Sequence, residues 1–267
     1  MKKLLTVASV FAVLFPAAGT AQEGNPLATR PGWELGGQVA HYRYLEPDFA
    51  KLSGNRVGIV AARTFTNAAG VFSRIDYRES YGRLKYESNG TGSQDHVPDW
   101  ILEARVVAGL DFAGNSVSFS PFLGLGYRYL YNDSRGYTTT GAIGYRRHSN
   151  YLYAPVGLTA RFHLGDRWVL APTLEADVFL QGRQVTKLSD TDSGLMDVTN
   201  EQKGGRGHRA SLMLEKGHWA IGAWTHYWHI KDSDLQCITA VVSGACLAGQ
   251  EPENYTRESG LEIRYRF

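Results

Sequence analysis

Histidines that lie close to carboxylates are the residues of this chain best suited to acid–base chemistry. Two such groups occur, and their members are Asp95, His96 and Asp99 in one segment and His226, His229, Asp232 and Asp234 in another. A histidine beside a carboxylate can act as a general base. His148 and Ser149 could belong to a Ser–His–acid set, but this pair alone is a weak signal. Such histidines are more often loop or interfacial residues, so we expect no catalytic residue.

The first 21 residues have the features of a secretory signal peptide. Residues 1–3 are a short basic start, residues 4–15 form an apolar run, and small residues allow cleavage after Ala21. Residues 22–267 are then expected to form a single domain. In an exported chain, two cysteines nine residues apart predict a disulfide, here between Cys237 and Cys246. No nucleotide, metal or haem motif is present, so no cofactor or metal is expected.

Alternation of apolar and polar residues predicts the elements that position these side chains. Residues 261–267 alternate strictly, with Leu261, Ile263, Tyr265 and Phe267 on one face of a strand. Nine earlier segments alternate in the same way. The ten predicted strands span residues 33–45, 56–65, 71–86, 100–112, 117–131, 151–162, 168–180, 206–215, 219–230 and 255–267. Residues 22–267 contain no stretch of roughly 18 consecutive apolar residues, so no transmembrane helix is expected.

The last strand, which ends in Tyr-Arg-Phe, resembles the C-terminal signature of bacterial outer-membrane β-barrel proteins. The resemblance implies an antiparallel, up-and-down transmembrane barrel, here of ten strands, with eight or twelve as alternatives. It places the protein in the outer membrane of a Gram-negative bacterium, among small barrels like OmpA, OmpX and Opa. It also implies that the barrel-assembly machinery reads Tyr265 and Phe267, and that lipid and lipopolysaccharide surround the protein. We expect a monomer, and the net charge of +2 argues against nucleic acid as a partner.

The connections and the aromatic residues favour this barrel over a soluble β-sandwich. Tight turns follow strands two, four, six and eight, whereas longer polar loops follow strands three, five, seven and nine. Two aromatic girdles are expected at the membrane interfaces. The turn side should carry Trp33, Trp100, Trp168, Trp219 and Phe267, and the loop side Tyr129, Tyr131, Tyr227 and Tyr255.

The polar faces of the strands predict a charged barrel interior in which arginine is the only base. Guanidinium groups pair with carboxylates in forked geometry. The expected network contains Glu34, Arg74, Asp76, Arg78, Glu103, Arg105, Arg128, Arg161, Glu175, Asp177, Arg209, Glu262, Arg264 and Arg266, with Arg56, Asp111 and Glu215 on the same faces. Ten strands are close to the eight of filled barrels. We therefore favour a salt-bridged interior, with a charged eyelet for solutes as the alternative.

Function remains divided among three hypotheses. The first is a structural or surface-interaction protein, the second a narrow, weakly selective porin, and the third an enzyme. Ten-stranded outer-membrane proteases, the omptins, exist, but their Asp-x-His spacing is absent and the predicted strands are shorter than theirs. Two segments favour surface contact. One is the loop that contains Arg135, Tyr137, Arg146, Arg147 and His148, and the other is the apolar tip between the two cysteines.

Overall fold

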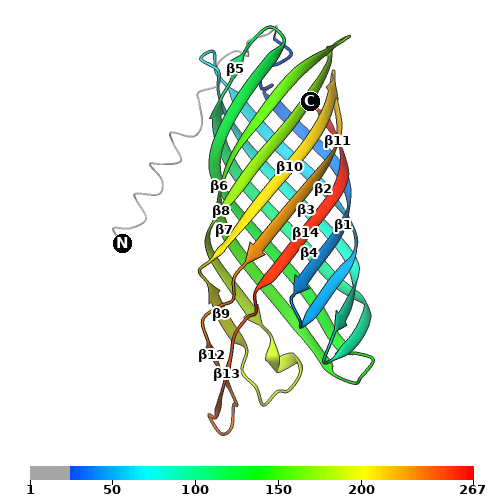
Figure 1. Cartoon of the computed structure of the whole chain (residues 1–267), viewed down its shortest axis with the longest axis vertical. Coiled ribbons are helices and arrows are strands. Elements are labelled where there is room, and N and C mark those ends of the chain that lie inside the picture. Colours follow the sequence, from blue (N-terminus) through cyan, green and yellow to red (C-terminus); the bar gives the residue numbers. More distant parts are fainter. Residues whose placement is uncertain (1–24) are drawn as a thin grey trace, which may run out of the picture.

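The computed structural model describes residues 25–267, so the expected signal peptide and its cleavage point lie outside the described residues. Ten long antiparallel strands form a closed barrel (Figure 1). They are β1 (Gly32–Glu46), β2 (Ala50–Thr66), β3 (Val71–Ser88), β4 (Gly92–Leu110), β6 (Val117–Tyr137), β7 (Ile143–Gly165), β8 (Trp168–Thr186), β10 (Gly205–Lys216), β11 (Trp219–Ile230) and β14 (Asn254–Arg266). The predicted fold class and strand number are confirmed.

Short elements decorate the two ends of the barrel. They are β5 (Phe112–Ala113), β9 (Val198–Gln202), β12 (Gln236–Thr239), β13 (Cys246–Gly249) and the 3₁₀ helix η1 (Leu188–Asp190). Strand β9 extends the barrel wall by pairing with β8, whereas β12 and β13 form a separate two-stranded sheet. Among residues 25–267, no helix is long and apolar enough to cross a membrane.

The barrel closes between its first and last strands, which pair in the register Glu34 with Arg266 and Leu35 with Tyr265. Alternation then decides which side chains face outward. Leu261 is 60% exposed, whereas its neighbour Glu262 is 7% exposed because it points into the barrel. The final strand therefore has the lipid face and the interior face that its sequence predicts.

A belt of exposed aliphatic side chains surrounds the outside of the barrel. It includes Leu35, Val39, Ile59, Leu123, Leu125, Leu174, Leu212, Ile221 and Leu261. So large an apolar surface is stable only against a comparable medium, which is the hydrocarbon of a bilayer. Trp33, Trp219 and Phe267 lie at its turn-side end, as expected, and all three are exposed.

The placement of Trp100 in the turn-side girdle was wrong. Trp100 pairs with Tyr81 on one neighbouring strand and with Tyr131 on the other, which puts it on the loop side. The reason is direction: β4 runs from the loop end of the barrel to the turn end. A residue at the start of the predicted fourth strand therefore lies opposite the end of the fifth.

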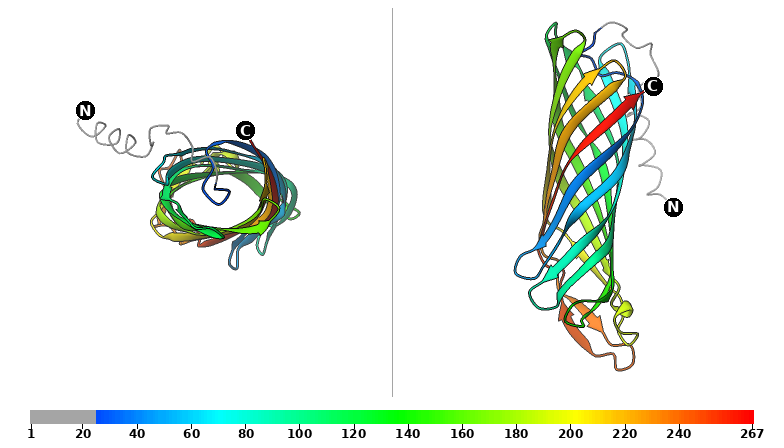
Figure 2. Two further views of the ribbon diagram at one scale, coloured as in Figure 1. Left: turned by 90° about the horizontal axis from the view of Figure 1, so that it is seen from above. Right: turned by 90° about the vertical axis from the view of Figure 1, so that its right-hand side faces the viewer.

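Several strands extend far beyond the predicted ends. Strand β7 has 23 residues, which at a rise of about 3.3 Å and a tilt of about 40° spans roughly 55–60 Å along the barrel axis. An apolar band is only about 25 Å tall. The long loops expected after strands three and five are therefore largely strand, and only residues 89–91 and 138–142 connect them. Figure 2 shows this taller wall beside the short β1–β2 hairpin.

The segment before β1 folds into the turn-side mouth of the barrel. Leu27 is fully buried, and Ser118 Oγ donates a hydrogen bond of 2.6 Å to its carbonyl oxygen. The backbone N–H and the hydroxyl of Thr29 both donate to Asp111, at 2.7 Å. The view along the barrel in Figure 2 shows this segment, in dark blue, inside the ring of strands. The turn-side mouth is thus narrowed by the chain's own backbone.

Candidate functional site in the barrel interior

The turn-side layer of the interior is organised around the carboxylate of Glu34. It accepts hydrogen bonds from Arg74 Nη2 at 2.7 Å and from Arg266 Nε at 2.8 Å, and Arg264 Nη1 lies 3.4 Å away. Arg74 Nε also donates to Asp76 at 2.7 Å. The layer therefore joins β1, β3 and β14 across the closing seam, and Arg264 is shared with Glu262 at 2.8 Å.

The middle layer is centred on Glu103, which is almost fully buried. Its carboxylate accepts from Arg209 Nη1 at 3.0 Å, from Arg78 Nε at 3.3 Å and from the hydroxyl of Tyr153 at 2.7 Å. Gly126 makes room for this tyrosine, because a Cβ there would lie 2.1 Å from the Tyr153 ring. The layer is thus a set of charge-assisted hydrogen bonds, which are stronger than neutral ones.

The same layer continues around the wall through two more carboxylates. Arg209 Nε donates to Asp177 at 2.6 Å and lies 3.1 Å from Glu175. Glu175 also accepts from Arg105 Nη1 at 2.7 Å, and Arg105 Nε donates to Asp76 at 3.1 Å. Each interior arginine here bridges carboxylates of different strands, so the network fixes the register of the wall.

Two members of the expected network have no carboxylate within hydrogen-bond distance in the described part of the chain. Arg161 Nη1 donates to Ser120 at 2.7 Å and lies 3.9 Å from Asp111. Arg128 is fully buried and its guanidinium lies 5.4 Å from the ring centroid of Trp228. A cation over an aromatic face is attracted by the ring quadrupole, which compensates part of the lost hydration.

Residues outside the expected network complete it. Glu258 accepts from Arg78 Nη1 at 2.8 Å and lies 3.8 Å from Arg56, while Asp99 pairs closely with Arg56 and accepts from Asn132 at 3.0 Å. Parity could have identified both acids. Glu258 lies four residues before Glu262, and Asp99 lies four before Glu103, so each shares an inward face with a predicted member.

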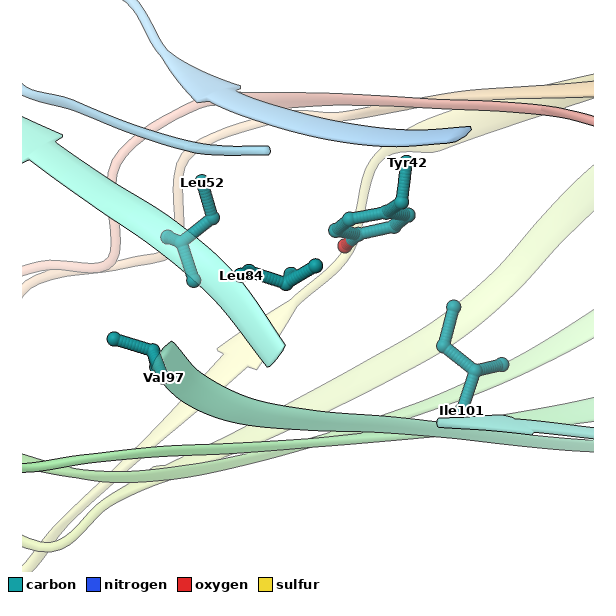
Figure 3. Close-up of a cluster of buried hydrophobic side chains, with 5 residues drawn as sticks. All are labelled: Tyr42, Leu52, Leu84, Val97 and Ile101. Carbon is teal, nitrogen blue, oxygen red and sulfur yellow. The ribbon is translucent and has the colours of Figure 1, made fainter. Parts of the chain in front are cut away.

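An apolar stopper, which sequence reasoning missed, fills the lumen towards the loop end. One part consists of Tyr42, Leu52, Leu84, Val97 and Ile101, and the other of Tyr151, Tyr153, Phe179, Trp228 and Ile230. Figure 3 shows the first part, with side chains of β1 to β4 converging inside the barrel. Leu130 packs against both parts and joins them. No stopper side chain is more than 9% exposed.

Small cavities remain on both sides of the stopper. Two chambers of about 100 and 160 Å³ lie on the turn side, share lining residues such as Arg105 and Arg264, and have charged residues as nearly half of their lining. A third of about 30 Å³ lies on the loop side, between Tyr42 and Arg147. The stopper therefore separates polar chambers from the extracellular mouth.

Arg147 was expected on the contact surface, and this was wrong: it faces the interior at the mouth. Its Nη1 atom lies 2.6 Å from Glu46 and 3.2 Å from Glu251. Glu251 belongs to the long connection at residues 231–253, and its backbone N–H donates to Ser233 Oγ at 2.9 Å. Burial, with help from the Glu46 carboxylate, raises the pKa of Glu251 to about 7, although Arg147 opposes the shift.

The same connection carries an extracellular lobe, which we define as residues 234–250. The expected disulfide between Cys237 and Cys246 is confirmed and joins β12 to β13. Exposed aliphatic side chains cover the lobe, and Val242 is 97% exposed. The others are Leu235, Val241 and Leu247, with Met196 beside them on the preceding connection. Residues 235–250 contain no charged residue.

The other residues proposed for surface contact lie on the β6–β7 hairpin. Tyr137 is exposed at its tip. Arg135 Nη2 lies 2.7 Å from Asp133, and Arg146 Nη2 lies 2.6 Å from Asp190. This hydrogen bond holds the pKa of Asp190 at about 2. Both arginines are thus already neutralised by carboxylates of this chain.

His148 faces outward on the same hairpin. Its Nδ1 atom lies 2.7 Å from the hydroxyl of Tyr129, and its ring packs 4.9 Å from that of Tyr131. Its neighbour Ser149 points inward and donates to Gln184 at 2.7 Å. Because adjacent strand residues face opposite sides of the wall, the pair does not form a Ser–His dyad.

The other acid–base candidates are not brought together either. Asp99 is bound to Arg56 inside the barrel, and His226 is buried among Arg209, Arg78 and Trp224. His229 faces outward, where it pairs with Glu253 and stacks on Tyr255. Asp234 pairs with Lys203. Across residues 25–267, no cluster of three or more His, Cys, Asp or Glu side chains could hold a metal ion.

One argument against a protease was wrong. We expected strands shorter than those of omptins, but β4, β6 and β7 have 19, 21 and 23 residues. Strand pairing continues beyond the membrane because polar residues form backbone hydrogen bonds there as readily as apolar residues do within it. The predicted short strands therefore give no argument against a protease, and the separation of this chain's candidate residues is the remaining structural argument.

Comparison with solved structures shows that the barrel shares its fold with an outer-membrane protein. It is similar to the outer-membrane protease OmpT of Escherichia coli, with a TM-score of 0.57 and 9% identity over 88% of this chain and 97% of that one. Other similar structures are the transport unit of the Escherichia coli autotransporter AIDA-I (TM-score 0.48, 12% identity, 98% and 97% covered) and Yersinia pestis Ail (0.35, 12%, 90% and 100%). No protein-family model and no curated protein sequence matches the chain. At such low identity, the likeness to OmpT shows a common fold.

Proposed function

Because this chain is an outer-membrane β-barrel, we propose that it is a non-conducting structural and surface-interaction protein of the Gram-negative outer membrane. The barrel anchors the protein, and the extracellular lobe and hairpins form its contact surface. A monomer is sufficient for this role, because the ten strands close on themselves.

The observation that carries the proposal is the apolar stopper. An ion that crossed it would have to displace these packed side chains and pass the Arg56 and Arg128 guanidinium groups that lie against Tyr42 and Trp228. Hydrophobic constrictions of this kind oppose conduction. Beneath it, the buried guanidinium and carboxylate groups of Arg209 and Glu103 bind each other rather than lining an open path. The lumen of a ten-stranded barrel is small enough for side chains to fill.

Planar-bilayer recording of the refolded protein tests this role. We expect no stable single-channel steps at moderate voltage in about 1 M KCl, where the Debye length of about 3 Å leaves little exclusion of ions by distant charges. Heat-modifiable gel mobility and protease protection of the membrane-embedded strands should verify insertion. Reproducible steps from inserted protein would overturn the proposal.

A narrow, weakly selective porin is the second candidate, and the two charged chambers on the turn side favour it. If the stopper opens, these chambers would form the permeation path. Replacing Leu84 and Trp228 with alanine should then increase conductance over that of the wild type. Under the non-conducting proposal, the wild type shows no conductance, whatever the conductance of the variant.

The lobe supports the surface-interaction part of the proposal because it combines an exposed apolar tip with a covalent constraint. A constrained tip loses little conformational entropy on binding. Cells that display the protein should adhere to apolar surfaces and immobilised proteins, and Val242→Lys should reduce adhesion. Gln250→Lys adds the same charge to the same lobe without removing an aliphatic side chain, so it should not. Equal adhesion by both variants would contradict a role for the tip.

A further inference from the structure

The outer face of the barrel carries arginines that no carboxylate neutralises. Arg43, Arg83 and Arg257 are all exposed and point outward. Within residues 25–267, none of their side chains makes a hydrogen bond or an ion pair. They differ in this respect from Arg135 and Arg146, the basic residues that the sequence suggested for surface contact, which are paired with aspartates.

The arrangement of two of these arginines is electrostatically unfavourable. Arg43 on β1 lies directly opposite Arg257 on β14. Side chains in such cross-strand pairs are about 5 Å apart at Cβ, and like charges there are destabilising. The row continues through Tyr227 and His208 on one side and through Ser53 and Lys85 on the other. Of the outer carboxylates near this row, Glu87 binds Lys51 and Lys85, and Asp95 lies near Lys85, so neither pairs with Arg43 or Arg257.

The height of this row matches the outer membrane surface. Arg43 is ten residues beyond Trp33 along β1, which marks the turn-side interface. At a rise of about 3.3 Å per residue and a tilt of about 40°, this separation is roughly 25 Å along the barrel axis, about the height of the apolar band. The arginines therefore lie where the phosphate groups of the outer leaflet begin.

Below the row come the polar outward residues His41, Ser259 and Asn55, and apolar side chains follow at the next outward position on the same strands. Val39, Leu261 and Val57 all point outward and are more than half exposed. A ligand that satisfied both parts would have an anionic head with several negative oxygens and hydrocarbon tails. Guanidinium groups bind phosphate in forked geometry, and one multivalent head could bridge Arg43 and Arg257 and relieve their repulsion.

We propose that the outward row around Arg43, Arg257 and Arg83 is a binding site for the phosphorylated headgroup of a glycolipid of the outer leaflet. The site deepens the proposed role by fixing the barrel's height and rotation in the membrane. It rests on the proposed membrane insertion but not on a closed lumen. A conducting barrel would therefore leave the lipid site standing, and a loss of lipid binding would leave the non-conducting proposal standing. The loop around Arg146 then has no part in headgroup binding.

Binding of bisphosphorylated lipid A to the protein refolded in a neutral detergent tests the site, with native mass spectrometry as the readout. The wild type should prefer this lipid to its dephosphorylated form. Arg43→Gln with Arg257→Gln should weaken binding at least about tenfold, because two charge-assisted contacts are lost. The matched control, Arg135→Gln with Arg146→Gln, removes two arginines that are already paired and should change affinity less than about twofold.

A charge reversal separates ligand binding from a purely structural effect. Arg43→Glu would place a carboxylate opposite Arg257, so the variant should gain thermal stability in neutral detergent and lose the stabilisation that lipid A gives the wild type. A double glutamine variant that is folded by gel mobility and binds like the wild type would overturn the site. Full competition by millimolar inorganic phosphate would overturn the glycolipid assignment in favour of a free anion.

Discussion

Replacing Glu103 with glutamine should destabilise the barrel more than replacing any exposed acid. The carboxylate is buried and accepts hydrogen bonds from Arg209, Arg78 and Tyr153. Glutamine has nearly the same shape, so the substitution removes a charge without leaving a cavity. It leaves two guanidinium groups facing a neutral amide, whose N–H₂ group cannot accept from them.

The size of the effect follows from this burial. Removing one partner of a buried ion pair costs about 3–5 kcal/mol, because the remaining charge stays desolvated. This corresponds to between about two and four powers of ten in the folding equilibrium constant. We would measure it by urea unfolding of protein inserted in phospholipid vesicles, followed by tryptophan fluorescence. Glu87→Gln, which breaks exposed pairs on β3, is the control and should leave the unfolding free energy unchanged within error.

A second variant checks the cause. Glu103→Gln combined with Arg209→Gln removes opposite charges together, so its loss should be smaller than the sum of the two single losses. Additive losses would contradict direct coupling. If Glu103→Gln itself cost no more than Glu87→Gln, the buried arginines would have to be hydrated or to form ion pairs with other groups. The reasoning from a desolvated, paired carboxylate would then be refuted.

Three further outcomes are expected. Leu84→Ala should cost about 2–5 kcal/mol of unfolding free energy because it opens a cavity in the stopper, and the lipid-facing Leu123→Ala should cost less in the same vesicles. The pKa of Glu251 is raised to about 7 in the docked connection, so docking is strongest at low pH and weakens as pH rises through about 7. Hydrogen exchange of residues 231–253, corrected for intrinsic rates, should therefore increase as pH rises. Glu251→Gln should remove this pH dependence. Reduction of the Cys237–Cys246 disulfide should cost the lobe about 2–3 kcal/mol and accelerate its proteolysis, while gel mobility of the barrel stays unchanged.

Period-two alternation was sufficient to predict the wall of the barrel. It requires only that one face meets lipid and the other does not, and this requirement acts on every strand. The parity of Glu262, Arg264 and Arg266 therefore placed them inside, and closure then put Glu34 beside them. The disulfide could also be predicted from the sequence, because two cysteines so close in the chain have few other partners.

The missed features depend on information that parity does not contain. Inward positions were expected to be polar, but parity fixes direction and not polarity, so Leu84 and Trp228 were not recognised as interior residues. The inward direction of Arg147 was hidden because its strand was predicted to start only at residue 151. Strand β7 starts at Ile143 because polar residues pair outside the membrane as readily as apolar residues pair within it.

The pairing of Glu34 has a consequence for the order of folding. Its contact with Arg74 joins residues 40 apart, whereas its contact with Arg266 joins residues 232 apart. Short loops close at lower entropic cost, so a β1–β3 sheet can assemble first and leave one side of this carboxylate open. Arg266 also lies 3.6 Å from Glu215 on β10. The last strand thus arrives with a cation that is attracted by Glu34 on one waiting edge and by Glu215 on β10, the strand next to the other edge, β11. This attraction favours the final insertion that turns an open sheet into a ring.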